Sequence, residues 1–273
     1  MMRSSLEVYE VAAGQVRVVF QTDDLIEAPN WDPLGGGFLV NGGGRLYRVP
    51  WEAPCLAPVE TGGLVRCNND HGFSPDGTQV AFSCHRENGA EIFVMSAEGG
   101  TARVISPRAP SWFHGWAPDG GSVVYAAARG ERREVDICVM PLGGVERRLT
   151  WGEGHSDGPE FSADGTRVYY NSDRDGHAQI WVMGVDGSGQ RQVFADEFVN
   201  WFPHPSPCGR QVLYLAYAPG TEGHPRDLPV ALCLMDPDGR NRRRVVEMIG
   251  GQGSINVASW APDGGAFAYM RFG

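Results

Sequence analysis

The segment Phe73-Ser-Pro-Asp-Gly77, followed shortly by Val80-Ala-Phe82, decides the fold of this chain. Proline presets φ at the second position of a tight turn, aspartate can bond the local backbone, and glycine accepts the exit geometry. The residues after the turn alternate between large and small apolar side chains, as a strand does. The segment therefore predicts a hairpin turn that leads into a β-strand.

The motif recurs along the whole chain. Clear copies are Trp116-Ala-Pro-Asp-Gly120, Phe161-Ser-Ala-Asp-Gly165 and Trp260-Ala-Pro-Asp-Gly264, and weaker copies are Trp31-Asp-Pro-Leu-Gly35 and Pro205-Ser-Pro-Cys-Gly209. The third position of the motif falls at residues 33, 75, 118, 163, 207 and 262, at intervals of 42, 43, 45, 44 and 55. Further strand-like segments follow each turn, such as Glu91-Ile-Phe-Val-Met95 and Arg103-Val-Ile105. Four antiparallel strands in about 40–45 residues is the period of a propeller blade.

The ends of the chain make up one further repeat. Pro262 lies 11 residues from the end and Pro33 lies 33 from the start, which together make 44. The last blade has only two strands of its own, and Glu7-Val-Tyr-Glu-Val11 and Arg17-Val-Val-Phe20 match the missing third and fourth strands. We therefore predict one all-β domain, a six-bladed β-propeller closed by its N-terminal strands. Its blades span approximately residues 22–61, 62–106, 107–151, 152–196, 197–248, and 249–273 with 1–21.

Composition limits the partners. The formal net charge is −10, so phosphate backbones and anionic lipid surfaces repel the chain, and we expect neither a nucleic-acid nor a membrane partner. No apolar run approaches the roughly 20 residues of a membrane span, and residues 1–8 do not resemble a secretory signal. The six cysteines have no CxxC spacing and are expected to be reduced. These features predict a cytoplasmic protein.

The repeats resemble those of the TolB family of propellers, whose units read aromatic-Ser-Pro-Asp-Gly followed by a strand like Ile-Trp-Val-Met, residues 180–183 here. TolB itself is periplasmic and carries an additional N-terminal domain. Because neither a leader nor that domain is expected here, the resemblance implies the fold and not the role of TolB in envelope assembly. Oligogalacturonate lyases are a more distant resemblance: they are propellers whose central pocket holds a divalent metal on His and Gln side chains. That resemblance implies metal-assisted lyase chemistry, without a residue-by-residue match of the ligands.

Polar side chains gather in the segments that lead into the innermost strand of each predicted blade. In a propeller these segments share one face, opposite the Pro-Asp-Gly turns. Aligned on the third motif position, His71 and His114 lie four residues before it, and Glu160 and His204 lie three before it. We therefore expect these side chains to converge near the axis. The candidate catalytic residues are His71, His114, His204, Asp70, Asp157 and Glu160.

The same face offers candidates for ligand binding. Trp112 and Trp201 align with each other and could stack on a sugar ring, or pack between blades. Arg86 and Arg174 could clamp a carboxylate, or be solvated loop residues. A longer loop at 217–229 contains His224 and could act as a lid. The candidate ligand-binding residues are Asn68, Asn69, Arg86, Trp112, His155, Arg174, Asn200, Trp201, His224, Gln252 and Asn256.

The histidines raise the possibility of a metal. His71, His114, His204 and Glu160 are predicted ligands of a divalent ion such as Mn, Zn or Ca, with a position left open for substrate or water. The alternative is that each histidine bonds a blade backbone. Asp70, Asp157 and Glu160 could instead act as acid and base in glycoside or lyase chemistry, or cap loop amides. No organic cofactor is predicted.

Two functions remain open from the sequence. In the first, the polar face binds a carbohydrate or another carboxylate-bearing small molecule and, as an enzyme, transforms it in metal-assisted lyase-type chemistry. In the second, the ring is a non-catalytic TolB-like scaffold that binds a protein or peptide. The density of His, Asn and carboxylate side chains on one face favours the first, because protein-binding surfaces more often present hydrophobic and aromatic anchors.

Overall fold

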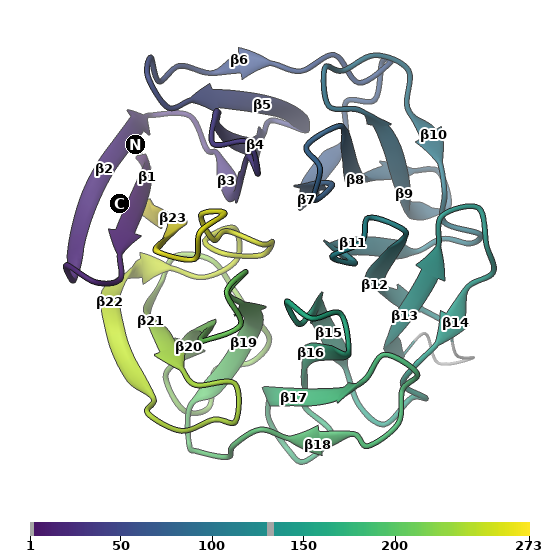
Figure 1. Ribbon diagram of the computed structural model, residues 1–273, viewed down its shortest axis with the longest axis vertical. Helices are drawn as coiled ribbons and strands as arrows, with labels where there is room; N and C mark the ends of the chain where they lie inside the picture. Colours follow the sequence, from purple (N-terminus) through teal and green to yellow (C-terminus); the bar gives the residue numbers. More distant parts are fainter. Residues whose placement is uncertain (1–2, 130–133) are drawn as a thin grey trace.

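The chain folds into a closed ring of six β-sheets around a central axis (Figure 1), in a computed structural model that describes residues 3–129 and 134–273. Each sheet is antiparallel and forms one blade, and in the five continuous blades the first strand lies nearest the axis. The six-bladed, all-β architecture confirms the prediction from the repeats. Across the described ranges, no helix is long and apolar enough to cross a membrane.

Five blades are continuous segments of four strands, which follow the chain from the axis outward. Blade 1 comprises β3 (Glu27–Trp31), β4 (Gly37–Gly42), β5 (Arg45–Pro50) and β6 (Ala57–Pro58). Blade 2 comprises β7 (Cys67–Phe73), β8 (Gln79–Arg86), β9 (Gly89–Ser96) and β10 (Arg103–Val104). Blade 3 comprises β11 (Ser111–Trp116), β12 (Ser122–Ala128), β13 (Val135–Pro141) and β14 (Arg147–Arg148). Blade 4 comprises β15 (Ser156–Phe161), β16 (Arg167–Ser172), β17 (Gln179–Gly184) and β18 (Arg191–Gln192). Blade 5 comprises β19 (Val199–Pro205), β20 (Val212–Tyr217), β21 (Leu228–Met235) and β22 (Arg243–Gly250).

Blade 6 joins the two ends of the chain. Strand β23 (Ala266–Phe272) pairs antiparallel with β1 (Ser4–Glu10), which in turn pairs with β2 (Gln15–Thr22), as predicted. Figure 1 shows the purple N-terminal strands beside the yellow C-terminal strand. The buried carboxylate of Glu7 accepts hydrogen bonds from the Tyr269 hydroxyl at 2.5 Å and from Arg271 Nε at 2.9 Å, so polar contacts also lock the closure.

The innermost strand of blade 6 is shorter than the innermost strands of the other blades. It is reduced to a single bridge between Trp260 and Phe267. Gly251 and Gly253, with φ of +119° and +91°, turn the backbone out of the extended conformation just before it. Two hydrogen bonds nevertheless hold this segment against β23: the Ser254 hydroxyl donates to the carbonyl oxygen of Met270, and the Met270 amide donates to the carbonyl oxygen of Ser254.

A β-bulge interrupts the innermost strand of blades 1 to 5. Register shifts occur at equivalent places, for example between Asp157 and Glu160 in β15 and between Trp201 and His204 in β19. In β19 the bulge places the non-glycine residue Phe202 at φ +54°, and the Asn171 side chain accepts a hydrogen bond from its amide at 3.1 Å. Bulges re-aim side chains, so the residues before and after each bulge face different parts of the central channel.

The motif turns form the opposite face. In blade 2 the Asp76 carboxylate accepts hydrogen bonds from the Ser74 hydroxyl at 2.6 Å and from the Thr78 amide at 3.0 Å. Leu34 and Cys208 occupy the aspartate position in the two weaker copies, and the turn hydrogen bond still forms there at 2.8 Å. The backbone geometry of the turn therefore tolerates loss of the aspartate.

Candidate functional site

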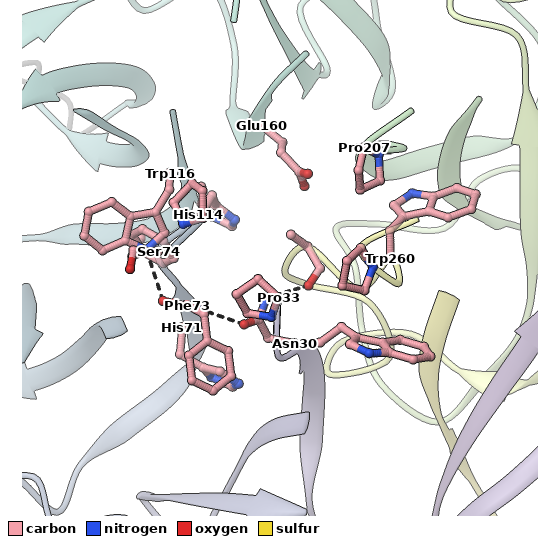
Figure 2. Close-up of a pocket in the computed structure, with 17 residues that line it drawn as sticks. Asn30, Pro33, His71, Phe73, Ser74, His114, Trp116, Glu160, Pro207 and Trp260 are labelled. Atoms are coloured by element: carbon pink, nitrogen blue, oxygen red, sulfur yellow. Dashed lines mark hydrogen bonds between the residues drawn. The ribbon is translucent and has the colours of Figure 1, made fainter. Parts of the chain in front are cut away.

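The central channel contains two chambers. The polar chamber, on the face of the loops that lead into the innermost strands, has a volume of about 220 Å³. The aromatic chamber, on the face of the motif turns, has a volume of about 320 Å³ (Figure 2). His114 lines both chambers and therefore lies between them. The polar chamber is lined by Asn68, Asn69, Asp70, Trp112, His114, Val135, His155, Asp157, Phe202, His224, Gln252 and Asn256.

Asp157 is the centre of the polar chamber. Its carboxylate lies 3.0 Å from Nε2 of His114, 3.4 Å from Nε2 of His155 and 3.8 Å from Nε2 of His224. The amide of Gly158, in the bulge of β15, donates to Oδ1 of Asp157 at 2.8 Å. The bulge thus holds one carboxylate against three imidazoles that come from blades 3, 4 and 5.

Burial and charge set the protonation of this group. Burial alone would raise the pKa of Asp157, but the hydrogen bonds and charges of His114 and His155 hold it well below its ordinary value. Burial works against protonation of His114 and His155, yet the Asp157 carboxylate outweighs it and raises the pKa of both. His224 differs, because burial outweighs the more distant carboxylate and lowers its pKa. The chamber therefore combines an ionised carboxylate with histidines of unequal basicity.

Asp70 supplies a second carboxylate. Burial raises its pKa to about 6, against the opposing effect of the nearby His114. Asn68 Nδ2 donates to Oδ2 of Asp70 at 2.5 Å. In the segment that leads into blade 6, Asn256 Nδ2 donates to Oε1 of Gln252 at 3.1 Å. Side-chain amides thus line the chamber together with the two carboxylates.

The long loop after β20 brings His224 into the chamber. The Tyr217 hydroxyl donates to the carbonyl oxygen of Pro225 at 2.9 Å, and Arg226 bonds Glu27 of blade 1 at 2.9 Å. The ring of His224 lies 4.4 Å from the ring of Trp201 and also bonds Gln252. These contacts extend the loop from blade 5 to blade 1 across one side of the chamber.

The aromatic chamber is built from the repeated motif itself. The first motif position supplies Trp31, Phe73, Trp116 and Trp260, and the third supplies Pro33, Pro75, Pro207 and Pro262. The indole nitrogens of Trp116 and Trp260 donate to the carbonyl oxygens of Gly72 and His204, at 3.1 and 2.8 Å. Figure 2 shows Glu160 reaching toward the centre of this chamber from one side.

Five of the six predicted catalytic residues line one or both chambers, and His204 is not among the lining residues of either. Asp70 and Asp157 lie in the polar chamber with His114, whereas His71 and Glu160 line the aromatic chamber. His71 Nε2 lies 3.3 Å from the carbonyl oxygen of Leu39, and burial lowers its pKa to about 4. The buried ring of His204 bonds Glu160 and the carbonyl oxygen of Ile255.

Four predicted ligand-binding residues lie outside the polar chamber. Arg86 is exposed at the end of β8. The Arg174 guanidinium lies 4.5 Å over the Trp181 ring and bonds Glu153 at 2.7 Å. Asn200 is buried and bonds Gln179 at 3.0 Å, and Trp201 is buried behind His155 and His224.

The four predicted metal ligands do not converge. His114 pairs with Asp157, His204 pairs with Glu160, and His71 faces a main-chain carbonyl. Within residues 3–129 and 134–273, no group of three or more His, Cys, Asp or Glu side chains is arranged to hold a metal ion. The predicted quartet therefore does not fit a divalent ion as a set, and metal binding stays a prediction.

Two lining residues of the polar chamber and most lining residues of the aromatic chamber were not predicted from the sequence. Phe202 lies within the bulge of β19, and Val135 lies at the start of β13. The aromatic chamber had a visible signal, because equivalent residues of a closed repeat form a ring around the axis. The motif predicts a hairpin turn, and this prediction assigns no role to its aromatic first position.

The chain resembles known proteins in both sequence and structure. Residues 108–224 match the model of the TolB beta propeller domain. The chain is 45% identical to Atu1656 of Agrobacterium fabrum over 274 aligned residues, which cover 99% of this chain and 93% of that protein. A solved, provisionally named TolB from Agrobacterium tumefaciens is 44% identical, has a TM-score of 0.97, and is matched over 100% of this chain and 99% of that one.

The chain belongs to the TolB-like β-propeller family. The more distant likeness to an oligogalacturonate lyase in complex with manganese is also present, at 14% identity and a TM-score of 0.57 over 83% of this chain and 67% of the lyase. At that identity the likeness shows the fold alone. The fold of this TolB-like propeller therefore does not specify its function, which depends on the residues of its own channel.

Proposed function

We propose that the polar chamber binds a small hydroxylated molecule of carbohydrate type. The observation that supports this most is the Asp157 carboxylate, held against three imidazoles in a chamber that is also lined by the amides of Asn68, Asn69, Gln252 and Asn256. Carboxylates accept hydrogen bonds, and amides and imidazoles offer both donors and acceptors. A ligand with several hydroxyl groups can donate hydrogen bonds to the carboxylates and both donate to and accept from the amides and imidazoles.

Size and charge narrow the ligand class. The volume of about 220 Å³ is below the roughly 300–1,000 Å³ of pockets for drug-sized ligands. Asp70 and Asp157 share the chamber with His114 and His155, whose protonated forms Asp157 favours, so groups of both signs line the chamber and no excess of one sign attracts a strongly charged ligand. Trp112 adds an aromatic surface on which a sugar ring can stack. A neutral sugar or polyol fits these features better than a carboxylate-bearing molecule does.

Acid–base catalysis would use His114. Its Nε2 bonds Asp157 at 3.0 Å, which fixes the ring and supports protonation. An imidazole can both give and accept a proton during turnover, and the Asp157 carboxylate raises the pKa of His114 and so favours its protonated form. We therefore propose lyase-type chemistry on a sugar with a free carbonyl group: His114 takes the proton from the carbon next to the carbonyl and gives it to the leaving oxygen as the C–O bond on the neighbouring carbon breaks, while Asp157 orients the His114 ring. A divalent ion could assist such a reaction, and the proposal does not require one.

The alternative is a non-catalytic scaffold that binds a protein or peptide over the same face. One observation favours it: the chamber has an open rim, where the His155 side chain is 39% exposed. A peptide side chain could enter there without movement of the ring.

The test is a calorimetric titration with neutral monosaccharides and polyols, uronates, and unstructured peptides. We expect the neutral sugars to bind the parent protein, and Asn69→Ala to weaken binding at least tenfold. Arg86→Ala is the matched control, because Arg86 is exposed outside the chamber, and it should bind as the parent does. Binding of peptides alone, or equal sugar affinity in Asn69→Ala and the parent, would refute the proposed ligand class.

A further inference from the structure

The aromatic chamber has an unusual hydrogen-bond inventory. Several donors and acceptors on its walls are already paired: the indole N–H groups of Trp116 and Trp260 bond carbonyl oxygens, and Asn30 bonds the Phe73 amide at 2.9 Å and the Ala258 carbonyl at 2.6 Å. Among the described residues, the Nδ1 atoms of His71 and His114 have no hydrogen-bond partner, but they are buried and closed off from solvent. The walls therefore offer a ligand mainly apolar contact.

Glu160 is the exception. Its Oε2 lies 2.5 Å from Nδ1 of His204, and in the described part of the chain no hydrogen bond reaches its Oε1. The Glu160 side chain is 13% exposed and the His204 side chain 3%, so the carboxylate is the end that faces the chamber. Figure 2 shows this carboxylate directed into the space between Trp116 and Trp260.

The partner of Glu160 is fixed by its own contacts. His204 Nε2 faces the carbonyl oxygen of Ile255, which can only accept a hydrogen bond, so Nε2 carries a hydrogen. The contact between Nδ1 of His204 and Oε2 of Glu160 is a hydrogen bond only if one of these two atoms also carries a proton. In both cases Oε1 stays free as an acceptor, and any positive charge of the pair lies on the imidazole inside the wall.

We propose that the aromatic chamber is a second ligand site, which takes an organic ammonium ion with an apolar or aromatic body. The body would lie against Phe73, Trp116 and Trp260, and the ammonium group would donate to Oε1 of Glu160. Aromatic faces attract cations, and the attraction increases when the cation is desolvated. The volume of about 320 Å³ accommodates a single ring with a short amine arm.

Charge favours a cation over an anion. Glu160 is the only Asp or Glu among the lining residues of this chamber, none of its lining residues is an arginine, and the charge of the lining His114 is paired with Asp157 in the polar chamber. The chain as a whole carries a formal charge of −10, which raises the local concentration of cations and lowers that of anions. A neutral alcohol could donate to Oε1 as well, but it would gain neither the charge-assisted bond nor the cation–π contact.

The site is independent of the polar chamber. His114 is shared, but its Nε2 is directed to Asp157 and its Nδ1 is closed to solvent, so the aromatic ligand would meet only the edge of its ring. Variants in the polar chamber should therefore leave the second site intact, and the reverse should hold for Glu160.

The experiment compares three probes of matched shape by calorimetry at pH 7: benzylammonium, benzyl alcohol and phenylacetate. We expect benzylammonium to bind the parent protein at least tenfold more tightly than benzyl alcohol, and phenylacetate not to bind. Glu160→Gln keeps the side-chain shape and the acceptor for His204, and it should weaken benzylammonium at least tenfold without changing benzyl alcohol. Glu153→Gln removes an exposed carboxylate outside the chamber and is the control.

Several results would overturn the proposal. Equal affinity for benzylammonium and benzyl alcohol in the parent protein would show that charge plays no part, and this comparison needs no variant to fold. Equal benzylammonium affinity in Glu160→Gln and Glu153→Gln would place the ammonium elsewhere. Loss of benzylammonium binding in Trp112→Ala, which alters only the polar chamber, would show that the two sites are one.

Discussion

Asp157→Asn should destabilise the propeller in a pH-dependent way. The contact of 3.0 Å between Asp157 and His114 corresponds to an attraction of about 5–6 kcal/mol at an effective dielectric constant of about 20. Desolvation of both groups opposes it, because the side chains are only 14% and 5% exposed. A hydrogen bond to a charged group typically contributes a net 1.5–3 kcal/mol, so we expect a loss of about 2–3 kcal/mol near pH 6.

The pH dependence follows from the two pKa shifts. The raised pKa of His114 stabilises the fold fully below its unfolded value of about 6.5, and this contribution is lost as the pH rises through the folded value. The lowered pKa of Asp157 stabilises the fold above its unfolded value of about 3.9, and this contribution is lost as the pH falls through the folded value. The difference between parent and variant should therefore be greatest between about pH 4 and 6.5 and become smaller as the pH rises through the folded pKa of His114, above which a neutral imidazole donates to the Asp157 carboxylate.

The assay is urea unfolding at several pH values, combined with a titration of the His114 ring by nuclear magnetic resonance. Asp157→Asn removes the main charge that opposes the effect of burial and leaves only the smaller effects of Asp70 and the Asn256 backbone, so the pKa of His114 should fall from its value in the parent protein. An unchanged His114 pKa in the variant, or a stability difference that is constant from pH 5 to 9, would refute the reasoning.

Three further predictions concern the frame around the chambers. Gly158→Ala should destabilise the protein more than Gly189→Ala does. Both glycines have a positive φ, which costs an alanine roughly 1–2 kcal/mol at either site, but only at Gly158 would the added Cβ lie 2.6 Å from a side-chain oxygen. Equal losses of stability in thermal unfolding would contradict this. Leu6→Ala, fully buried in the closing strand β1, should cost about 2–5 kcal/mol in urea unfolding, whereas Val16→Ala, 46% exposed in β2, should cost under about 0.5 kcal/mol; similar losses would show that closure does not depend on this core. Tyr217→Phe removes the bond that ties down the long loop and should cost about 1 kcal/mol and speed hydrogen exchange at residues 218–227; unchanged exchange would mean that the loop is held by its other contacts.

The fold could be predicted because it is a repeat. Each copy of the Pro-Asp-Gly turn is local chemistry, and the spacing of the copies gives the blade period without knowledge of distant contacts. The same reasoning placed β1 and β2 in the last blade, since only they supply its missing strands. It did not predict the shortened innermost strand of blade 6, because Gly251 and Gly253 act through backbone conformation that the strand pattern does not display.

The candidate site could be predicted only as far as one face of the ring. Alignment on the motif placed Asp70, His114 and Asp157 on the loop face, where the structure brings them together. It could not separate Glu160 from them, because the bulge in β15 decides that Asp157 and Glu160 face different chambers. Bulge positions depend on cross-strand register, which the spacing of one strand does not contain.

The most direct test of the proposed function is a histidine ring spectrum of the protein with and without a neutral monosaccharide. Occupation of the polar chamber should shift the ring signals of His114, His155 and His224, which all lie around Asp157, and leave the signals of His71 and His204 in place. If no tested sugar shifts the first three signals, or if His204 alone responds, the polar chamber is not the sugar site that this geometry supports.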